Sequence, residues 1–242
     1  ASYDRRAQKV ARAMIRLLKA AGASFAVMQE ERCHAEFARR MGEEYLFQTA
    51  AQENLENFSQ YAFKRILTAC PHCFNTFANE YPDFEGFSYP VVSHTVWINE
   101  AIREGKLPDV SATQPGTVYH DPCYLARMNG IVDAPREVLR KVTCELKLPA
   151  ETGEKTFCCG AGGGQMWSEG DVARKVNVIR LMDLRATGAS QIAVACPHCL
   201  TMLESARSVD RDAADTPVMD IAEIVAQALD DRSAGAKEDS HV

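Results

Sequence analysis

The chain has 242 residues, of which 46% are hydrophobic, and a net charge of −6 at pH 7. This length allows one large core or two cores of roughly 100–120 residues each. The acidic balance argues against nucleic acid as a partner, because phosphate binding requires an excess of Lys and Arg. Nine cysteines without the features of a secreted protein indicate a reducing compartment and metal or redox chemistry rather than a disulfide framework.

Apolar spacing predicts alternating helices and strands in the first part of the chain. In chain order these are a helix over 5–20, a strand over 24–28, a helix or helix pair over 35–61, a buried strand over 65–69, and a strand stub with a following helix over 90–98, capped near Ser93. The strand at 65–69 runs directly into Cys70, so it should hold this thiol at a strand end.

The second part repeats this order after a polar segment at residues 106–116 that we interpret as a linker. Its predicted elements are a strand over 117–120 that leads to Cys123, a helix starting near Pro135, a helix over 169–186, a strand over 191–195 that runs into Cys196, and a strand stub and helix over 217–225, capped near Asp220. Alternating strands and helices predict an α/β fold.

The cysteines reveal why the two parts resemble each other. Five of them follow the pattern C-x34-C-C-G-x35-C-x2-C, and these are Cys123, Cys158, Cys159, Cys196 and Cys199. A shift of 126 residues places three of these on Cys33, Cys70 and Cys73, and Ala-Cys-Pro-His-Cys occurs in both copies. The sequence thus predicts two similar halves from an internal duplication of about 126 residues: a degenerate half over 1–110, a complete half over 114–230, and a disordered tail over 231–242.

The spacing of these cysteines suits a metal centre. A C-x-x-C segment at a strand-to-helix junction brings two thiolates one turn apart, and the glycines after Cys159 provide the irregular backbone that adjacent ligands need. Soft thiolates select iron–sulfur clusters, zinc or copper(I). Five thiolates exceed the four that a tetrahedral zinc or an ordinary cubane requires, which favours an unusual cluster or a fifth, redox-active thiol.

The complete motif resembles the cysteine-rich (CCG) domain of the heterodisulfide reductase B/D subunit family. The surrounding segments Gly42–Gln48, His120–Cys123, Asp133–Leu139 and Phe157–Gly164 are most similar to membrane-linked iron–sulfur oxidoreductases that act between electron-transfer flavoprotein-type donors and quinone. The resemblance covers nearly the whole chain, up to about Leu229. It implies an oxidoreductase, as a fragment or subunit of a larger enzyme, with a flavoprotein or ferredoxin-like redox partner. It also implies a cytoplasmic location, at the membrane face and in contact with quinone if an upstream segment spans the membrane.

By this resemblance the five cysteines of the complete motif bind a non-cubane or [4Fe-4S] cluster. The first copy departs from the pattern, since Arg32 and His34 replace a cysteine and the glycine, and the leading cysteine would fall just before Ala1. We therefore expect an incomplete site in which Cys33, Cys70 and Cys73 hold a [4Fe-4S] cluster or zinc with a further donor. The candidates for that donor are His34 and the leading cysteine of the motif, which would then lie in sequence that precedes this chain.

Three alternatives remain open from the residues alone. The chain could be a non-catalytic electron relay or structural zinc module, or Cys-Pro-His-Cys could act as a thiol–disulfide oxidoreductase dithiol. The glycine run at 162–164 could bind phosphate, but it lacks the order of a nucleotide-binding loop. No catalytic residue is identifiable. Cys144 is expected to be a buried thiol outside the site, His72 and His198 to tune the cluster by hydrogen bonding, and His94 and His120 to cap or pack rather than bind metal.

Overall fold

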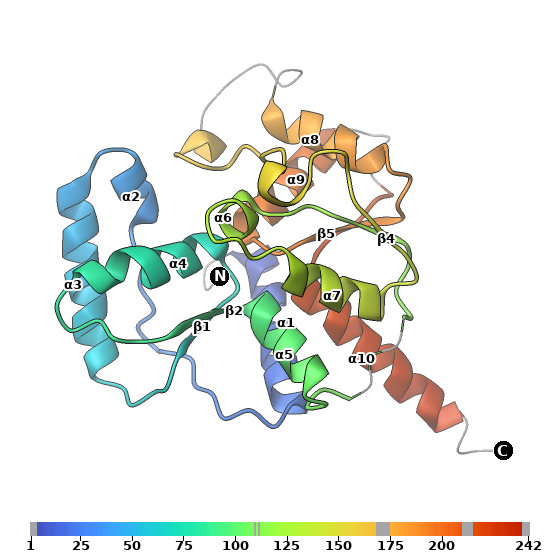
Figure 1. Ribbon diagram of the computed structural model, residues 1–242, viewed down its shortest axis with the longest axis horizontal. Coiled ribbons are helices and arrows are strands. Elements are labelled where there is room, and N and C mark those ends of the chain that lie inside the picture. Colours follow the sequence, from blue (N-terminus) through green and yellow to red (C-terminus); the bar gives the residue numbers. More distant parts are fainter. Residues whose placement is uncertain (1–3, 109, 111, 168–174, 210–214, 239–242) are drawn as a thin grey trace.

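Short parallel strands form two separate sheets in the computed structural model, which describes residues 4–108, 110, 112–167, 175–209 and 215–238 (Figure 1). The smaller sheet pairs β1 (Ile66–Thr68) with β2 (Val91–Ser93). The larger has the order β4-β3-β5-β6, with β3 at Thr117–Tyr119, β4 at Leu146–Lys147, β5 at Gln191–Val194 and β6 at Val218–Asp220. Both sheets are parallel, so the predicted α/β class is confirmed.

Helices connect the strands in both halves. In the first half these are α1 (Arg5–Ala20), α2 (Glu36–Arg40), α3 (Glu44–Ser59), α4 (Pro71–Asn75), a π-turn and a 3₁₀-turn over 76–83, and α5 (His94–Arg103). In the second they are α6 (Cys123–Ala126), α7 (Asp133–Val142), α8 (Val176–Arg185), α9 (Pro197–Val209) and α10 (Ile221–Glu238), with 3₁₀-turns at 153–155 and 165–167. Figure 1 shows α8 and α9 on one side of the larger sheet and α7 and α10 on the other.

The duplication is visible in the register of the strands. Ile66 of β1 pairs with Val91 of β2, and Ile192 of β5 pairs with Val218 of β6. In both halves the strand before Ala-Cys-Pro-His-Cys, β1 or β5, leads through this segment into a helix. The strand paired with it, β2 or β6, leads directly into α5 or α10. The predicted equivalence of the two strand-to-helix junctions is therefore confirmed.

The hydrophobic core crosses the boundary between the halves. The apolar face of α1, which includes Val10, Met14 and Leu17, packs against α10. Trp97 and Ile98 of α5 belong to the same buried cluster as residues of α7, α9 and α10. A second, aromatic cluster with Phe47, Phe58 and Tyr81 at its centre lies within the first half. The first half thus has a small core of its own and contributes two helices to the larger one.

Three sequence expectations need correction. Residues 24–28 form no strand, and Phe25 and Val27 are 37% and 65% exposed, because the first-half sheet ends at β1 and β2 and offers this segment no partner. Strand β1 is only half-buried, although the pattern predicted a buried strand. The start of the predicted tail at Asp231 is too early, since α10 continues to Glu238 and Asp231 accepts a hydrogen bond from Gln114 (2.7 Å). Residues 239–242 of the predicted tail lie outside the described part of the chain.

The remaining predicted helices agree with the structure. The helix at 5–20 and the helix pair within 35–61 are confirmed as α1, α2 and α3. The helix expected over 169–186 is observed as Val176–Arg185, and residues 168–174 lie outside the described part of the chain. No helix of the described residues combines the length and apolar character needed to cross a bilayer.

Candidate metal centre

Two cysteines occupy the equivalent strand-to-helix junctions. Cys70 follows β1 and immediately precedes Pro71, the first residue of α4, and Cys196 stands in the same place between β5 and Pro197 of α9. Proline suits the first helical position, because its φ is preset and its missing N–H is not needed there. The thiols that follow, Cys73 and Cys199, lie within the first helical turn, on the same side of the helix as the junction.

The remaining thiols of the complete motif are brought in by two loops that share one anchor. Asp121, fully buried between β3 and Cys123, accepts hydrogen bonds through Oδ2 from Arg136 (3.0 Å), the Thr152 hydroxyl (2.6 Å) and Gly153 N–H (2.9 Å). The Thr156 hydroxyl donates to the Asp121 carbonyl (2.9 Å). This network ties the loop that carries Cys123 to the segment that leads into Cys158 and Cys159.

Gly160 permits the tight turn after the adjacent cysteines. Its φ is +89°, which is outside the range that other residues adopt readily, and a Cβ at this position would lie 3.1 Å from the Cβ of Val176. The Gly160 N–H donates to the Sγ of Cys158 (3.2 Å). The predicted irregular backbone is therefore present at this position, and its amide faces sulfur.

These elements bring seven thiols into one continuous series in which each thiol lies near enough to the next to shift its pKa. In order they are Cys123, Cys158, Cys159, Cys199, Cys196, Cys70 and Cys73. The series passes from the second half into the first at the contact between Cys196 and Cys70. The two cysteine sites, separate in the sequence, are thus neighbours in space.

Protons are shared unequally along this series. Hydrogen bonds from Cys123 and Cys159 lower the pKa of Cys158 to about 2, and the interaction with Cys158 raises the pKa of Cys159 to about 12. Hydrogen bonds from Cys196 and Cys73 hold the pKa of Cys70 well below its usual range. The pKa values of Cys123, Cys73 and Cys199 are raised, first by the hydrogen bond in which each keeps its proton beside a neighbouring sulfur and then by burial. Burial is the main cause of the raised pKa of Cys196.

A metal cation among these thiols would allow all of them to lose their protons. Seven sulfurs this close cannot all ionise unless positive charge lies between them, and metal binding deprotonates thiols outright. Cys159, Cys196 and Cys199 are at most 3% exposed, so water cannot supply that stabilisation. The chemistry and burial of the donor set therefore fit a thiolate-bound metal cluster.

Two sets of three potential metal donors lie within 4.8 Å of one another among the described residues. The first is His120 with Cys159 and Cys199, and the second is His72 and His198 with Cys196. His120 is fully buried, and burial together with the Arg180 charge lowers its pKa to about 3, so that the ring is neutral. The sequence predicted a capping or packing role for His120, and the structure also places its ring beside two of the thiols.

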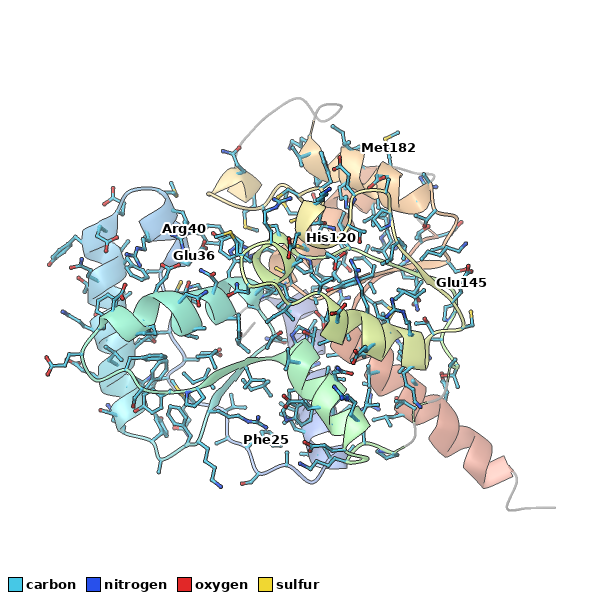
Figure 2. All side chains as sticks on the ribbon, in the orientation of Figure 1. Phe25, Glu36, Arg40, His120, Glu145 and Met182 are labelled. Carbon is cyan, nitrogen blue, oxygen red and sulfur yellow. The ribbon has the colours of Figure 1, made fainter. Side chains whose placement is uncertain are left out.

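A buried carboxylate lies at the contact between the halves. Glu36 is 1% exposed and accepts hydrogen bonds from His72 Nδ1 (3.2 Å) and from the Tyr124 hydroxyl (2.8 Å). The rings of His72 and Tyr124 stack with centroids 3.9 Å apart, and His198 meets His72 edge-on. Figure 2 shows Glu36 and Arg40 projecting from α2 towards the second half, where His120 lies.

The degenerate site is more open. Cys33 is exposed, and its Sγ accepts a hydrogen bond from Ala35 N–H (3.3 Å). His34 Nε2 lies 3.0 Å from the Sγ of Cys73, so the histidine that replaces the motif glycine reaches the thiols of this half. Within the described residues Cys33 is not part of the series of seven thiols, although its sequence repeat predicts it beside Cys70 and Cys73.

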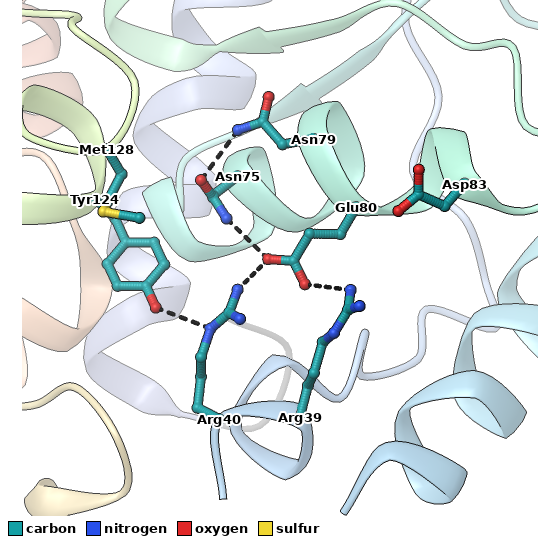
Figure 3. Close-up of a pocket in the computed structure, with 8 residues that line it drawn as sticks. All are labelled: Arg39, Arg40, Asn75, Asn79, Glu80, Asp83, Tyr124 and Met128. Carbon is teal, nitrogen blue, oxygen red and sulfur yellow. Dashed lines mark hydrogen bonds and ion pairs between the residues drawn. The ribbon is translucent and has the colours of Figure 1, made fainter. Parts of the chain in front are cut away.

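An open depression of about 610 Å³ lies between the halves on the far side of Tyr124 (Figure 3). Glu80 at its floor accepts hydrogen bonds from Arg39 (2.9 Å), Asn75 (2.9 Å) and Arg40. Arg40 in turn donates to the Tyr124 hydroxyl (3.2 Å). Tyr124 thus separates this polar surface from His72.

The sequence did not identify several residues that shape the site: Glu36, Asp121, Tyr124 and Arg180. Asp121 belongs to the segment His120–Cys123, which resembles the family, and Arg180 is a charged residue among apolar neighbours. Both positions could therefore have been noticed in the sequence. The predicted burial of Cys144 was wrong. This thiol is exposed, because the segment after α7 pairs through its backbone with Gln114 (2.8 Å) at the sheet edge and leaves the side chain in solvent.

Comparison with known proteins supports the duplicated motif. A curated relative from Chromohalobacter salexigens, named "Probable membrane-anchored ferredoxin", is 41% identical over 94% of this chain and 35% of its own length. An EtfAB:quinone oxidoreductase of Syntrophomonas wolfei is 37% identical over 95% of this chain and 33% of its own length. The D subunit of a dihydromethanophenazine:CoB–CoM heterodisulfide reductase from Methanosarcina barkeri is 32% identical over 88% of this chain.

The chain spans about a third of the length of the first two relatives and 54% of the third. The model of the cysteine-rich domain called CCG matches residues 1–78 and again residues 117–204. These two ranges contain the two cysteine sites described above, which explains the 126-residue repeat. The chain belongs to the CCG family of cysteine-rich domains and carries this domain twice.

Proposed function

We propose that this chain is the electron-transferring iron–sulfur module of an oxidoreductase. The observation that carries the proposal is the gathering of seven thiols in one series, three of them almost completely buried, which supplies soft ligands in a dry environment. An iron–sulfur cluster bound there would accept and release single electrons. The protein's own contribution is to hold the thiolates together, exclude water and provide hydrogen bonds to sulfur.

Cys123, Cys158, Cys159, Cys196 and Cys199 are the proposed ligands of this cluster, which is either a non-cubane or a [4Fe-4S] cluster. Three of these thiols are almost completely buried, and the other two lie in loops that the Asp121 network holds together. Five thiolates in one half exceed what a tetrahedral zinc requires, which favours the iron–sulfur assignment.

Cys33, Cys70 and Cys73 are the proposed ligands of a second centre, either [4Fe-4S] or zinc, with His34 as an additional donor. The 3.0 Å approach of His34 Nε2 to Cys73 supports this part of the proposal. We expect weaker binding here than in the second half, because Cys33 is exposed and the described thiols number only three. The contact between Cys70 and Cys196 would place the two centres close enough for direct electron exchange.

The proposed partners follow from the relatives that resemble this chain. One relative is named for electron-transfer flavoprotein and quinone, and another is named a membrane-anchored ferredoxin. We propose a flavoprotein or ferredoxin-like redox partner, with quinone as the electron acceptor of the complete enzyme and a position at the cytoplasmic face of a membrane. The division into halves at 1–110 and 114–230 is proposed as the duplication boundary.

Anaerobic purification with iron, sulfide and zinc analysis tests the function. We expect a brown protein whose iron and sulfide are lost together and whose electron paramagnetic resonance signal changes on reduction. A colourless protein that contains zinc alone would overturn the proposal. The Cys-Pro-His-Cys segment of the second half is disfavoured as a thiol–disulfide oxidoreductase dithiol, because Cys196 and Cys199 are 1% and 2% exposed and a nucleophilic thiol must reach its substrate.

A further inference from the structure

One buried histidine has a ring nitrogen without a hydrogen-bond partner among the described residues. This is Nε2 of His120, which is fully buried at the end of β3. A nitrogen of this ring lies within 4.8 Å of the sulfur atoms of both Cys159 and Cys199. An unpaired polar atom in a dry interior is costly, so a partner is expected at this position.

The partner of the other ring nitrogen, Nδ1, determines the tautomer of His120. Arg180 donates its Nε–H to His120 Nδ1 (3.0 Å). A guanidinium carries donors only, so Nδ1 must act as an acceptor and the imidazole proton must reside on Nε2. A neutral imidazole that is protonated on Nε2 cannot bind a metal through this nitrogen, but it can donate a hydrogen bond.

Arg180 is held rigidly enough to impose this arrangement. Its side chain is fully buried, it forms an ion pair with Asp183, and its Nη2 donates to the carbonyl of Glu151 (3.3 Å). A buried charge with several partners has little freedom to turn away. The tautomer of His120 is therefore set by a residue of the neighbouring helix α8.

We propose that His120 donates its Nε2–H to a sulfur of the iron–sulfur cluster in the second half, and that Arg180 acts as the positioning residue that fixes this donor. The inference rests on the proposed function, because it needs a cluster as the acceptor. The acceptor is either the Sγ of Cys159 or Cys199 or an inorganic sulfide bound between them.

His72 provides a contrast within the same molecule. Its Nδ1 faces the carboxylate of Glu36 (3.2 Å), which can only accept, so this nitrogen carries a proton. Nδ1 of His120 faces a donor instead, the guanidinium of Arg180. The two rings are therefore fixed by partners of opposite polarity, and in His120 it is Nε2 that carries the proton.

The consequence is a change in the reduction potential. A donor aimed at cluster sulfur stabilises the more negative, reduced state, and hydrogen bonds to sulfur are among the factors that set cluster potentials. His120 should therefore raise the potential of the cluster in the second half. Without this donor the cluster would be harder to reduce.

The experiment measures the reduction potential of the anaerobically purified chain for the wild type and three variants. His120→Leu removes the donor at similar volume, and His120→Gln retains an N–H near the position of Nε2. Arg180→Met keeps the ring but frees its tautomer. We expect a more negative potential for His120→Leu, a smaller shift for Arg180→Met, and a value near the wild type for His120→Gln, with iron content unchanged in all four proteins.

A coloured His120→Leu protein with the wild-type potential would overturn the inference and leave the proposed function standing. A colourless wild type would overturn both. Pulsed electron paramagnetic resonance of ¹⁵N-histidine-labelled wild type and His120→Gln provides a second test. His72 and His198 lie beside Cys196 and contribute to both spectra, so the difference between the spectra reports His120. A weak ¹⁵N coupling that is lost in His120→Gln supports the hydrogen bond, whereas a lost coupling of the strength of a direct iron–nitrogen bond, or no difference, overturns it.

Discussion

Asp121 shows how one side chain can position several ligands that belong to different loops. Its Oδ2 accepts three hydrogen bonds in a fully buried environment, one of them from the Arg136 guanidinium. Charge-assisted hydrogen bonds are stronger than neutral ones, and an uncompensated buried charge is strongly unfavourable. The residue is therefore important for both stability and ligand geometry.

Replacement of this carboxylate should be costly. We expect Asp121→Asn to reduce the free energy of unfolding by about 3 to 5 kcal/mol, because Arg136 would be left without its counter-ion in a largely buried position. Urea unfolding followed by circular dichroism measures the loss. Asp230→Asn is the matched control, since Asp230 pairs with Arg16 on the exposed surface and should contribute less than about 1 kcal/mol. Equal losses in both variants would contradict the assigned role of Asp121.

The cysteines themselves can be separated into ligands and bystanders. Cys159→Ser or Cys196→Ser should abolish the visible absorbance of the anaerobically reconstituted protein, because both thiols lie inside the series of seven thiols. Cys144→Ser should leave the absorbance intact, because this thiol is exposed and stands outside the repeat. Loss of the chromophore in Cys144→Ser would show that the ligand set has been assigned incorrectly.

The sequence identified the cysteines that the structure brings together, but few of the residues that surround them. The spacing of the cysteines is a local property of the chain, and the duplication makes it recognisable. Which nitrogen of His72 or His120 carries a proton depends instead on Glu36 and Arg180, which approach from α2 and α8. Such partners are distant in sequence, so no local pattern contains them.

At the scale of elements, the turn after the adjacent cysteines depends on its glycine. Gly160→Ala should destabilise the loop for two reasons: the positive φ costs about 1 to 2 kcal/mol for a residue with a Cβ, and the 3.1 Å contact with Val176 forces further overpacking. We expect lower thermal stability and a reduced iron content per chain after reconstitution.

Comparison with Gly22→Ala separates the cost of the close contact with Val176 from the cost of the positive φ. Gly22 also has a positive φ, +64°, but a Cβ there would meet nothing within 4 Å. This variant should show only the backbone cost and retain its full iron content. If both variants behaved alike, the close approach of Val176 to the cysteine loop would have no consequence for metal binding.

The strand expected at 24–28 was placed incorrectly for a physical reason. The segment has the apolar composition of a strand, but strand formation requires a neighbour, and the described first-half sheet consists of β1 and β2. Tertiary context overrode the local preference there, whereas the junctions at Cys70 and Cys196 were predictable because local and tertiary signals agree.

The whole molecule is built more asymmetrically than its duplicated sequence suggests. Helices α1 and α5 come from the first half, but their apolar residues belong to the core that α7, α9 and α10 form. Among the described residues the four-stranded sheet belongs to the second half, while the first half contains two strands and an aromatic cluster. The complete cysteine motif therefore packs against the larger core, which contains residues from both ends of the chain.

This shared core leads to a prediction about cooperativity. Leu17 of α1 is completely buried and packs in the core that α10 belongs to, so Leu17→Ala should reduce the free energy of unfolding by about 2 to 5 kcal/mol. Because the same core supports β5 and α9, the loss should appear in a single transition that removes the visible absorbance and the helical signal at the same temperature. Leu46→Ala, at a position that is 54% exposed, should change stability by less than about 0.5 kcal/mol. If instead the helical signal of Leu17→Ala were lost in two steps, with the chromophore surviving the first, then α1 would be an independent unit and the metal centre would not depend on the first half for its stability.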